Sequence, residues 1–535
     1  MFFGRWKMKP VNRNHRRKGS DCEITRETSS SQTTENTSQK NHNTRKRNKN
    51  KLYSIAHSDL LGRYLTANKN ITAGEIIIEK DEPLVIGPVQ QSQLLCLGCY
   101  VIINNVNDYR CTKCNWPMCS SSCSGLYKRT GHDVGECKIL AEISFDGEMQ
   151  RDVINVYNFI VPLRCLLLKR SSQSKWNTLL SMESHNNIRR SIKNIWNLNT
   201  KTVVEKLQKY FDPDEIHTVC GILEVNCFEV TKDELSLRAL FPLAFLLSHN
   251  CVPNTIHTND EHFQLKVRAS VDIPKGEPIT ISYAYTLHGT VKRRAHIKET
   301  KFFDCTCDRC ADPTELGTNN STITCPKCNH ASLVSCSPLI EDTRWICKYR
   351  KCSGFSVSDS YVQDLIEKLE SELKLISDDD VETFEIWLKR AASNLHENHY
   401  LILGVKYTLS LLYGKTQGYM IHEMNEDLLR RKVTICEDIL KVADIIEPGL
   451  SRLRGIILYE LHAPLMMLTT QKFKSQNVSK KQLKHSLQKI IQYLKEACTI
   501  MEFESEATTE GQIAQAARQA LDATYEWEKT LGKLT

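Results

Sequence analysis

Long hydrophobic runs are missing from this 535-residue sequence. No stretch approaches the ~20 consecutive apolar residues that a membrane-spanning helix requires, so we expect no membrane span. The N-terminal MFFGRWKMKP has no apolar core of the kind that directs secretion, and polar sequence follows it directly. Both absences predict a protein that is not secreted and that works in the nucleus, the cytoplasm or both.

Apolar residues are also scarce at the start of the chain. Residues 1–51 contain 14 Lys and Arg but four Asp and Glu, so they carry more positive charge than the net +8 of the whole chain. Low hydrophobicity with high net charge is typical of disorder, and we expect residues 1–50 to form a disordered basic tail. The tail could be a nuclear address, a loose contact with nucleic acid or acidic partners, or a solvated leader without function. The rest of the chain is slightly acidic, so nucleic acid is not expected to be the main ligand.

Cysteine, by contrast, is abundant, with 22 residues. Eight of them lie in residues 22–137 and eight in residues 305–352, many as closely spaced pairs. Without an export signal, such pairs favour zinc sites over disulfides. A chain of this length with 41% hydrophobic residues is expected to fold as several modules that have cores of their own.

The first cysteine group contains four ligand pairs within residues 96–137. Its members are Cys96, Cys99, Cys111, Cys114, Cys119, Cys123, His132 and Cys137. Eight nitrogen and sulfur ligands are enough for two tetrahedral zinc sites, and a CxxC spacing lets two thiolates from one turn reach the same ion. A segment this short buries too little apolar surface to fold alone, so zinc would supply the folding free energy, roughly 10–16 kcal/mol per site.

A second cysteine group is one ligand short of a zinc site. KFFDCTCDRC supplies Cys305, Cys307 and Cys310. The fourth thiolate has to come from elsewhere, and Cys251 in LLSHNCVPN (residues 246–254) is the candidate. A zinc ion with these four ligands would hold the polar corner at Cys251 beside a segment far downstream.

A third cysteine group precedes a helical region. Cys325-x2-Cys328 and Cys347-x4-Cys352 are two pairs that resemble a zinc ribbon. From residue 356 onwards apolar residues recur at helical spacing, as in YVQDLIEKLESELKLI, and pairs of such helices resemble tetratricopeptide-type hairpins. We therefore expect a zinc-ribbon-like module followed by a C-terminal helical domain.

The order of these motifs resembles that of one protein family. LGRYLTANKNITAGEIIIEKDEPLV (residues 61–85) precedes the first cysteine group, and LLSHNCVPN, IPKGEPITISYAY (residues 273–285) and the C-x-C-x2-C motif follow it. A SET domain split around a MYND zinc finger is typical of the SMYD family, and the ribbon-like third group resembles the arthropod-type SmydA branch. The resemblance implies an α+β multidomain protein with a β-rich SET fold, a post-SET zinc site and a C-terminal α-helical, TPR-like domain.

The resemblance also implies module boundaries and zinc ligand sets. The predicted modules are residues 1–50 (tail), 51–95 (N-terminal part of SET), 96–137 (MYND finger), 138–220 (helical insert), 221–300 (SET core), 301–320 (post-SET), 321–355 (zinc-ribbon-like module) and 356–535 (helical domain). In MYND fingers the ligands interleave, which implies one site of Cys96, Cys99, Cys119 and Cys123 and another of Cys111, Cys114, His132 and Cys137. With one ion in the post-SET site and one in the ribbon, the chain is predicted to bind up to four zinc ions.

The activity that the resemblance implies is S-adenosylmethionine-dependent methylation of protein lysines. The family's Gly-x-Gly cofactor loop corresponds to Gly62, Arg63 and Tyr64, so a bulky residue replaces the second glycine. The family's Asn-His pair corresponds to Ser248 and His249, where a hydroxyl replaces an amide. These five residues are predicted to contact the cofactor.

Further positions concern the adenine and the methyl acceptor. Phe303 corresponds to the ring that stacks on adenine, and Tyr283 corresponds to the first tyrosine of the lysine channel and is the predicted catalytic residue. Lys301 replaces the second channel tyrosine, and its positive charge would oppose a lysine substrate. Asn226 and Phe228 resemble the segment that lines the substrate side.

Two functions are consistent with these residues. In the first, the protein is a lysine methyltransferase for histone or non-histone proteins, weakened by the changes at Tyr64, Ser248 and Lys301. In the second, the SET core is a scaffold in transcriptional regulation, and the MYND finger and the helical domain bind protein partners. In both cases the expected partners are proteins or peptide substrates, and we expect a monomer.

Overall fold

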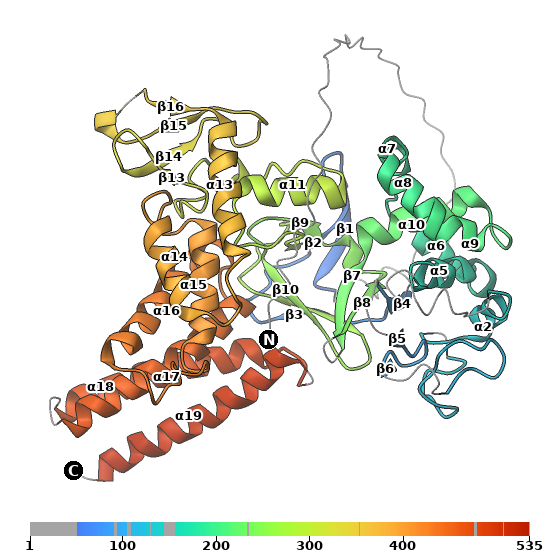
Figure 1. Cartoon of the computed structure of the whole chain (residues 1–535). Helices are drawn as coiled ribbons and strands as arrows, with labels where there is room; N and C mark the ends of the chain where they lie inside the picture. Colours follow the sequence, from blue (N-terminus) through green and yellow to red (C-terminus); the bar gives the residue numbers. More distant parts are fainter. Residues whose placement is uncertain are drawn as a thin grey trace.

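The computed structural model describes most of the chain beyond the basic tail. The described residues are 51–89, 94–103, 109–128, 130–143, 156–232, 235–352, 354–475, 479–506 and 508–533. The tail predicted at residues 1–50 lies outside them. Figure 1 shows a half built of small sheets and short helices beside a second half built of long helices. None of the described helices is long and apolar enough to cross a membrane.

Small sheets form the centre of the predicted SET region. Their strands are β1 (Tyr53–Ser58), β2 (Gly62–Ala67), β3 (Ile76–Asp81), β4 (Val85–Pro88), β7 (Phe228–Lys232), β8 (Leu235–Leu240), β9 (Ser248–His249), β10 (Thr255–Asn259), β11 (Leu265–Ala269) and β12 (Thr280–Ile281). Two sheets have three strands, in the orders β10-β11-β3 and β4-β8-β7, and β1-β2 and β12-β9 form two-stranded sheets. The β9 and β12 strands pair in parallel, which brings the Ser248 corner beside Thr280.

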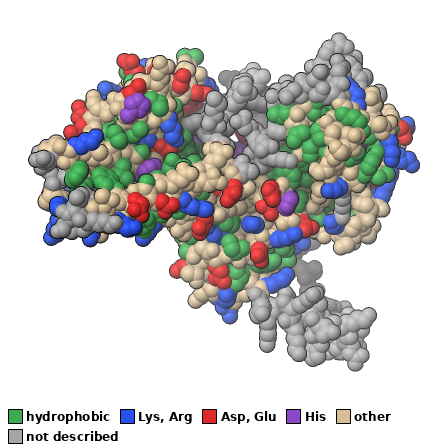
Figure 2. All heavy atoms as spheres, turned by 90° about the horizontal axis from the view of Figure 1, so that it is seen from below, with side chains coloured by type: hydrophobic (Ala, Val, Ile, Leu, Met, Phe, Trp, Pro, Cys, Tyr) green, Lys and Arg blue, Asp and Glu red, His purple; other side chains and the backbone are tan. Residues whose placement is uncertain are grey.

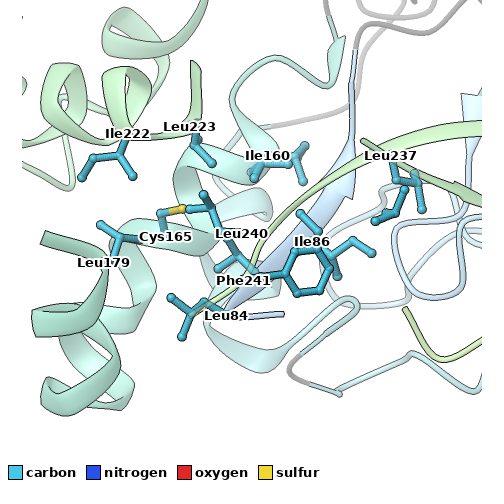
Figure 3. Close-up of a cluster of buried hydrophobic side chains, with 14 of the residues drawn as sticks. Leu84, Ile86, Ile160, Cys165, Leu179, Ile222, Leu223, Leu237, Leu240 and Phe241 are labelled. Carbon is cyan, nitrogen blue, oxygen red and sulfur yellow. The ribbon is translucent and has the colours of Figure 1, made fainter. Parts of the chain in front are cut away.

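The hydrophobic core of this half lies where helix α5 (Ile160–Ser171) covers the β4-β8-β7 sheet. Every residue of α5 from Ile160 to Leu168 is buried, and all of them except Arg164 are apolar, as expected for a helix enclosed by the core. In Figure 3, Ile86, Leu240 and Phe241 gather with side chains of α5 and of the neighbouring helices. Each fully buried aliphatic side chain contributes about 1.5–3 kcal/mol, so this contact fixes the sheet relative to the helices.

Short elements complete this half of the molecule. They are β5 (Leu94–Leu95), β6 (Ile102–Ile103), α2 (Val134–Leu140), α6 (Gln173–Leu180), α7 (Asn186–Ser191), α8 (Lys193–Asn199), the π-helical turn η1 (Thr200–Val204), α9 (Glu205–Leu207), α10 (Pro213–Asn226), the 3-10 turn η2 (Ala244–Leu246), α11 (Thr290–Lys301) and α12 (Asp308–Ala311). The start of α10 follows from its sequence. Asp212 accepts hydrogen bonds from the backbone N–H groups of Asp214 and Glu215, and Pro213 takes the first helical position.

A four-stranded antiparallel sheet and long helices make up the rest. The strands are β13 (Ile323–Thr324), β14 (Ala331–Ser335), β15 (Trp345–Cys347) and β16 (Ser356–Val357), with the 3-10 turn η3 (Arg350–Cys352); the helices are α13 (Asp359–Leu373), α14 (Val381–Ala391), α15 (Tyr400–Leu412), α16 (Glu426–Ile446), α17 (Arg452–Lys474), α18 (Lys480–Met501) and α19 (Thr509–Lys533). Ser479 and Gln482 form a reciprocal capping box at the start of α18. The C-terminal helical region that the periodicity predicts is therefore confirmed.

Charged side chains hold the C-terminal helices α13–α19, which together form the helical lobe, against the β10-β11-β3 sheet. Arg268 of β11 donates to the carbonyl oxygen of Ile500 at 2.8 Å, and its guanidinium lies 4.4 Å from the ring centroid of Phe503. Glu504 accepts a 2.9 Å hydrogen bond from the Thr258 hydroxyl of β10 and a 2.9 Å bond from Arg452 Nε of α17. These contacts hold the helices beside the sheet that precedes the predicted post-SET segment.

The charged side chains on one face of the molecule are mixed in sign. Figure 2 shows Lys, Arg, Asp and Glu interspersed with apolar side chains on the face seen from below. A surface of this kind does not have the continuous positive potential that binds a phosphate backbone.

The Asp81 carboxylate orders the turn that leads to the Ser248 corner. Asp81 ends β3, is 2% exposed, and accepts hydrogen bonds from the backbone N–H groups of Leu243 at 3.0 Å and Ala244 at 2.8 Å. Burial raises the pKa of Asp81 from 3.8 to about 6, although the two N–H donors act in the opposite direction. A buried acid therefore caps η2, the 3-10 turn immediately before β9.

We predict that Asp81→Asn changes how stability depends on pH. Because the native pKa is above the unfolded value, native Asp81 binds a proton that the unfolded chain has released; this stabilisation is complete below pH about 4 and lost as pH rises through about 6. The amide oxygen of the substituted side chain would still accept the two N–H bonds, but the amide would not titrate. Relative to the variant, the wild type should lose up to about 3 kcal/mol between pH 4 and pH 7.

Thermal unfolding at several pH values measures this difference. Asp59→Asn, at an exposed position in the β1–β2 turn, is the control and should follow the wild type at every pH. Parallel pH profiles for wild type and Asp81→Asn would contradict the assignment of the titration to Asp81.

Candidate functional site

Four groups of cysteine and histidine side chains come together in the structure. The groups are Cys96, Cys99, Cys119 and Cys123; Cys111, Cys114, His132 and Cys137; Cys251, Cys305, Cys307 and Cys310; and Cys325, Cys328, Cys347 and Cys352. In each group the candidate ligand atoms lie within 4.8 Å of one another. These are the four sets that the spacing and the resemblance predict, including the interleaved pairing in the first cysteine group.

The sulfur positions fit zinc better than disulfides. Close pairs of Sγ atoms are separated by 3.6 Å between Cys96 and Cys123, 3.5 Å between Cys251 and Cys310, and 3.9 Å between Cys325 and Cys352. A disulfide requires about 2.05 Å. Tetrahedral zinc with Zn–S bonds of about 2.3 Å places the sulfur atoms about 3.8 Å apart, so each group is compatible with one zinc ion.

The histidine of the MYND-type group is oriented by a buried acid. His132 Nε2 lies 3.3 Å from Cys114 Sγ, while its Nδ1 lies 2.8 Å from Glu136 Oε1. Arg164 of α5 donates to Glu136 and also to the carbonyl oxygens of Ile86 and Leu97. Burial alone would raise the pKa of Glu136, but Arg164 and His132 hold it below its usual range. This network fixes the imidazole with Nε2 toward the metal position.

Two arginines surround the group around Cys251. Arg293 of α11 donates from Nη2 to Cys310 Sγ at 3.5 Å and from Nη1 to Glu315 at 2.7 Å. Arg309 donates from Nε to the same carboxylate at 3.1 Å and from Nη1 to the carbonyl oxygen of Cys251 at 3.3 Å. Four thiolates and one Zn²⁺ would carry a net negative charge, which these guanidinium groups offset. The spacing of the cysteines gives no indication of these arginines.

We predict four zinc ions per chain and the loss of one in Cys325→Ser. Removing one thiolate from the ribbon group leaves three ligands in a site that needs four, so that ion should dissociate while the other three remain. Elemental analysis of the purified protein measures the count. Cys336→Ser is the matched control, because Cys336 is exposed, lies in the same module and belongs to none of the four groups. Equal zinc content in both variants would contradict the ribbon site.

The residues predicted to contact the cofactor lie in β2, at the Ser248 corner and just after α11. Arg63 lies with its guanidinium 5.4 Å from the ring centroid of Phe245, in the turn just before β9, and also donates to the carbonyl oxygen of Ser181. Gly62, at the start of β2, has φ +63°, which favours glycine, and no atom lies within 4 Å of a Cβ built there. Tyr64 is half-buried and pairs with Ala56 across the β1-β2 hairpin.

Ser248 carries a buried hydroxyl without a partner in the described part of the chain. The residue is 8% exposed, and its Oγ has no hydrogen bond there. An unsatisfied buried hydroxyl costs free energy, so such an atom is expected where a ligand or an ordered water supplies the missing bond. The position therefore fits a polar atom of a bound cofactor.

His249 joins the Cys251 group to Tyr283. Its Nε2 lies 3.3 Å from Cys251 Sγ, and its Nδ1 accepts a 2.9 Å hydrogen bond from the backbone N–H of Tyr283. Both ring nitrogens thus have partners inside the chain, and the predicted cofactor contact of His249 would be made by the rest of its ring. The sequence places this histidine near the cysteine but does not reveal its bond to Tyr283.

Aromatic rings surround Tyr283. Its ring centroid lies 5.2 Å from that of His249 and 6.5 Å from that of Phe303, and the Phe303 side chain remains 37% exposed. The Tyr283 hydroxyl donates to the carbonyl oxygen of Leu247 at 2.5 Å, and burial raises the pKa of this phenol above its ordinary value. Tyr283 is therefore a neutral phenol whose orientation is fixed by the chain that enters the corner.

Lys301 is a further neighbour of Tyr283. It is the last residue of α11; its Nζ donates to the carbonyl oxygen of Val225 at 2.6 Å and lies 5.5 Å from the Tyr283 ring centroid. Burial lowers the pKa of Lys301, and Cys227 and Glu224 offset part of that effect. The residue that the alignment of motifs places in the acceptor channel thus points toward the predicted catalytic tyrosine.

Comparisons with known proteins show what the chain is similar to. The SET domain family model matches residues 62–284. This stretch of the chain is therefore similar to SET domains, and the matched relatives include proteins named as histone-lysine and N-lysine methyltransferases.

Within that class, the chain is similar to SMYD proteins, as the motif order predicts. The SET domain-containing protein SmydA-8, isoform B, of Drosophila melanogaster is 30% identical over 295 residues, which cover 51% of this chain and 60% of that protein. The histone-lysine N-methyltransferase ASHR1 of Arabidopsis thaliana is 24% identical over 429 residues, covering 74% of this chain and 83% of that protein. The human N-lysine methyltransferase SMYD2 is 35% identical over 102 residues, covering 18% and 23%.

Proposed function

We propose that the chain is an S-adenosylmethionine-dependent protein-lysine N-methyltransferase, acting on histone or non-histone proteins, whose activity is restrained by the residues of its own pocket. The observation that carries this proposal is the buried, unpartnered hydroxyl of Ser248 beside His249 and Tyr283. An abandoned pocket would be expected to fill with apolar side chains or to satisfy its polar atoms internally. In the described residues, however, the Ser248 position has kept a polar side chain, and its hydroxyl has no internal hydrogen-bond partner.

The surroundings of Ser248 also fit a cofactor of this kind. Gly62 leaves open space beside the backbone of β2, and Phe303 presents a partly exposed ring next to His249. A ring in this position can stack on adenine, and a backbone without side chain can approach a ligand closely. S-adenosylmethionine, when bound, would supply an electrophilic methyl group.

Tyr283 and its neighbours can prepare an acceptor amine. A lysine accepts a methyl group through its neutral amine, and burial lowers the pKa of a lysine. The same surroundings already lower the pKa of Lys301. Tyr283, fixed by Leu247, would orient the amine, and exclusion of water would keep it unprotonated.

The second candidate function is that of a scaffold, and the position of Lys301 favours it. A lysine that lies over Tyr283 in the resting protein reduces access for an acceptor, and Tyr64 and Ser248 alter the cofactor side. The MYND-type finger and the helical lobe would then act by binding protein partners in transcriptional regulation. The two functions differ in whether the protein binds S-adenosylmethionine.

We predict that zinc-replete full-length protein binds S-adenosylmethionine in the micromolar range and that Ser248→Ala weakens this binding. Loss of one hydrogen bond should reduce the affinity about 3- to 10-fold, corresponding to about 0.5–1.5 kcal/mol. Ser248→Asn and Tyr64→Gly, which restore the family residues, should strengthen it. Isothermal titration calorimetry measures all four proteins.

Two further variants separate cofactor binding from methyl transfer. Ser191→Ala removes an exposed helical hydroxyl outside the pocket and should bind like the wild type. Tyr283→Phe should bind the cofactor within about twofold of the wild type but transfer methyl groups to histones more slowly. No detectable binding to any of these proteins would favour the scaffold, and equal binding by Ser248→Ala and wild type would remove Ser248 from the cofactor site.

A further inference from the structure

One primary amine of the chain is held by groups that recognise amines. Lys301 Nζ donates a 2.6 Å hydrogen bond to the carbonyl oxygen of Val225 and lies 5.5 Å from the centroid of the Tyr283 ring. In the described part of the chain no carboxylate is within ion-pair distance of it. Its contacts are therefore a carbonyl oxygen and an aromatic face, which attract an ammonium group without neutralising it.

The carbonyl oxygen that accepts this bond belongs to a helix end. Val225 is in the last turn of α10, where carbonyl groups have no partner within the helix and the helix dipole is negative. Lys301 therefore satisfies a backbone acceptor of the helical insert while it lies over a side chain of the SET core. Its amine joins two parts of the molecule that are separate in the sequence.

The helix that carries Lys301 ends directly after this residue. Phe302 ends α11 with φ +60°, in the left-handed region that a non-glycine residue adopts at a cost of about 1 kcal/mol. Its ring lies 5.6 Å from that of His185, in an edge contact. Lys301 is thus the last residue of the helix, and rotation about its own side-chain bonds is enough to withdraw its amine from Val225 and Tyr283.

From these contacts we infer that Val225 and Tyr283 form a primary-amine site that Lys301 occupies in the resting protein. An acceptor lysine enters this site only after Lys301 has left it, so Lys301 restrains methyl transfer and selects for acceptors able to displace it. The inference rests on the proposed function, because it identifies the amine site with the acceptor site. It also explains why a pocket suited to a cofactor would contain a competing cation.

The test removes the Lys301 side chain and asks whether a small added amine binds in its place. Lys301→Ala removes three methylenes and the amine, which n-propylammonium replaces. Thermal unfolding of full-length, zinc-replete protein is measured with increasing n-propylammonium chloride and, separately, with 1-propanol. We expect a saturable rise in melting temperature for the variant, with half-saturation in the millimolar range, and no saturable rise with 1-propanol.

Matched variants keep the result interpretable. Lys298→Ala removes an exposed lysine from the same helix, and this variant and the wild type should show no saturable response to n-propylammonium. Lys301→Ser offers a similar vacancy and is measured in parallel, so the test remains decisive if Lys301→Ala does not fold. Absence of stabilisation in the vacancy variants, or equal stabilisation by 1-propanol, would overturn the amine site.

Methyl transfer and cofactor binding distinguish this inference from the proposed function. Lys301→Ala should bind S-adenosylmethionine like the wild type in calorimetry and methylate histones at least about tenfold faster, a change of about 1.4 kcal/mol in the barrier. A variant that responds to n-propylammonium but does not bind the cofactor would contradict the proposed function and leave the amine site intact. A variant that binds the cofactor but neither responds to the amine nor gains activity would contradict the inference alone.

Discussion

The contact on which the candidate site depends is the pair of hydrogen bonds made by His249. Its Nε2 lies 3.3 Å from Cys251 Sγ, and its Nδ1 accepts from the backbone N–H of Tyr283 at 2.9 Å. A metal ion at Cys251 would fix the thiolate, the thiolate would fix the imidazole, and the imidazole would fix the tyrosine. The geometry around Tyr283 is therefore coupled to the Cys251 group through His249.

Much of the metal chemistry could be predicted from the sequence, because ligand spacing is a local property. CxxC pairs place two sulfurs on one turn whatever the rest of the chain does, and even the distant Cys251 could be found because three thiolates needed a fourth. The buried charges that surround the groups were not predictable in this way. Arg164 and Glu136 meet only through the packing of α5 on the finger, and Arg293 and Glu315 only through the packing of α11. The spacing of the cysteines carries no signal for either pair.

For the predicted cofactor and acceptor residues, the sequence gives the residue type, and the fold gives the surroundings of the side chain. The motif order identified Ser248 and Lys301 as replacements of family residues, and each replacement alone suggested a loss. The fold adds that the Ser248 hydroxyl is buried without a partner in the described part of the chain and that the Lys301 amine is bound to a helix-end carbonyl. Neither fact follows from residue type, since a serine and a lysine at those positions could equally have faced water.

These two placements have opposite energetic consequences. The unsatisfied Ser248 hydroxyl destabilises the empty pocket, and a ligand that supplies the missing hydrogen bond would remove this cost. The Lys301 ammonium group, by contrast, stabilises the occupied amine site, and its hydrogen bond would be broken when a substrate entered. The zinc-compatible groups and the Arg293–Glu315–Arg309 network hold most of the surroundings rigid. On the inference drawn above, removal of one cation would restore access without rebuilding the rest, which distinguishes such a pocket from a degraded one.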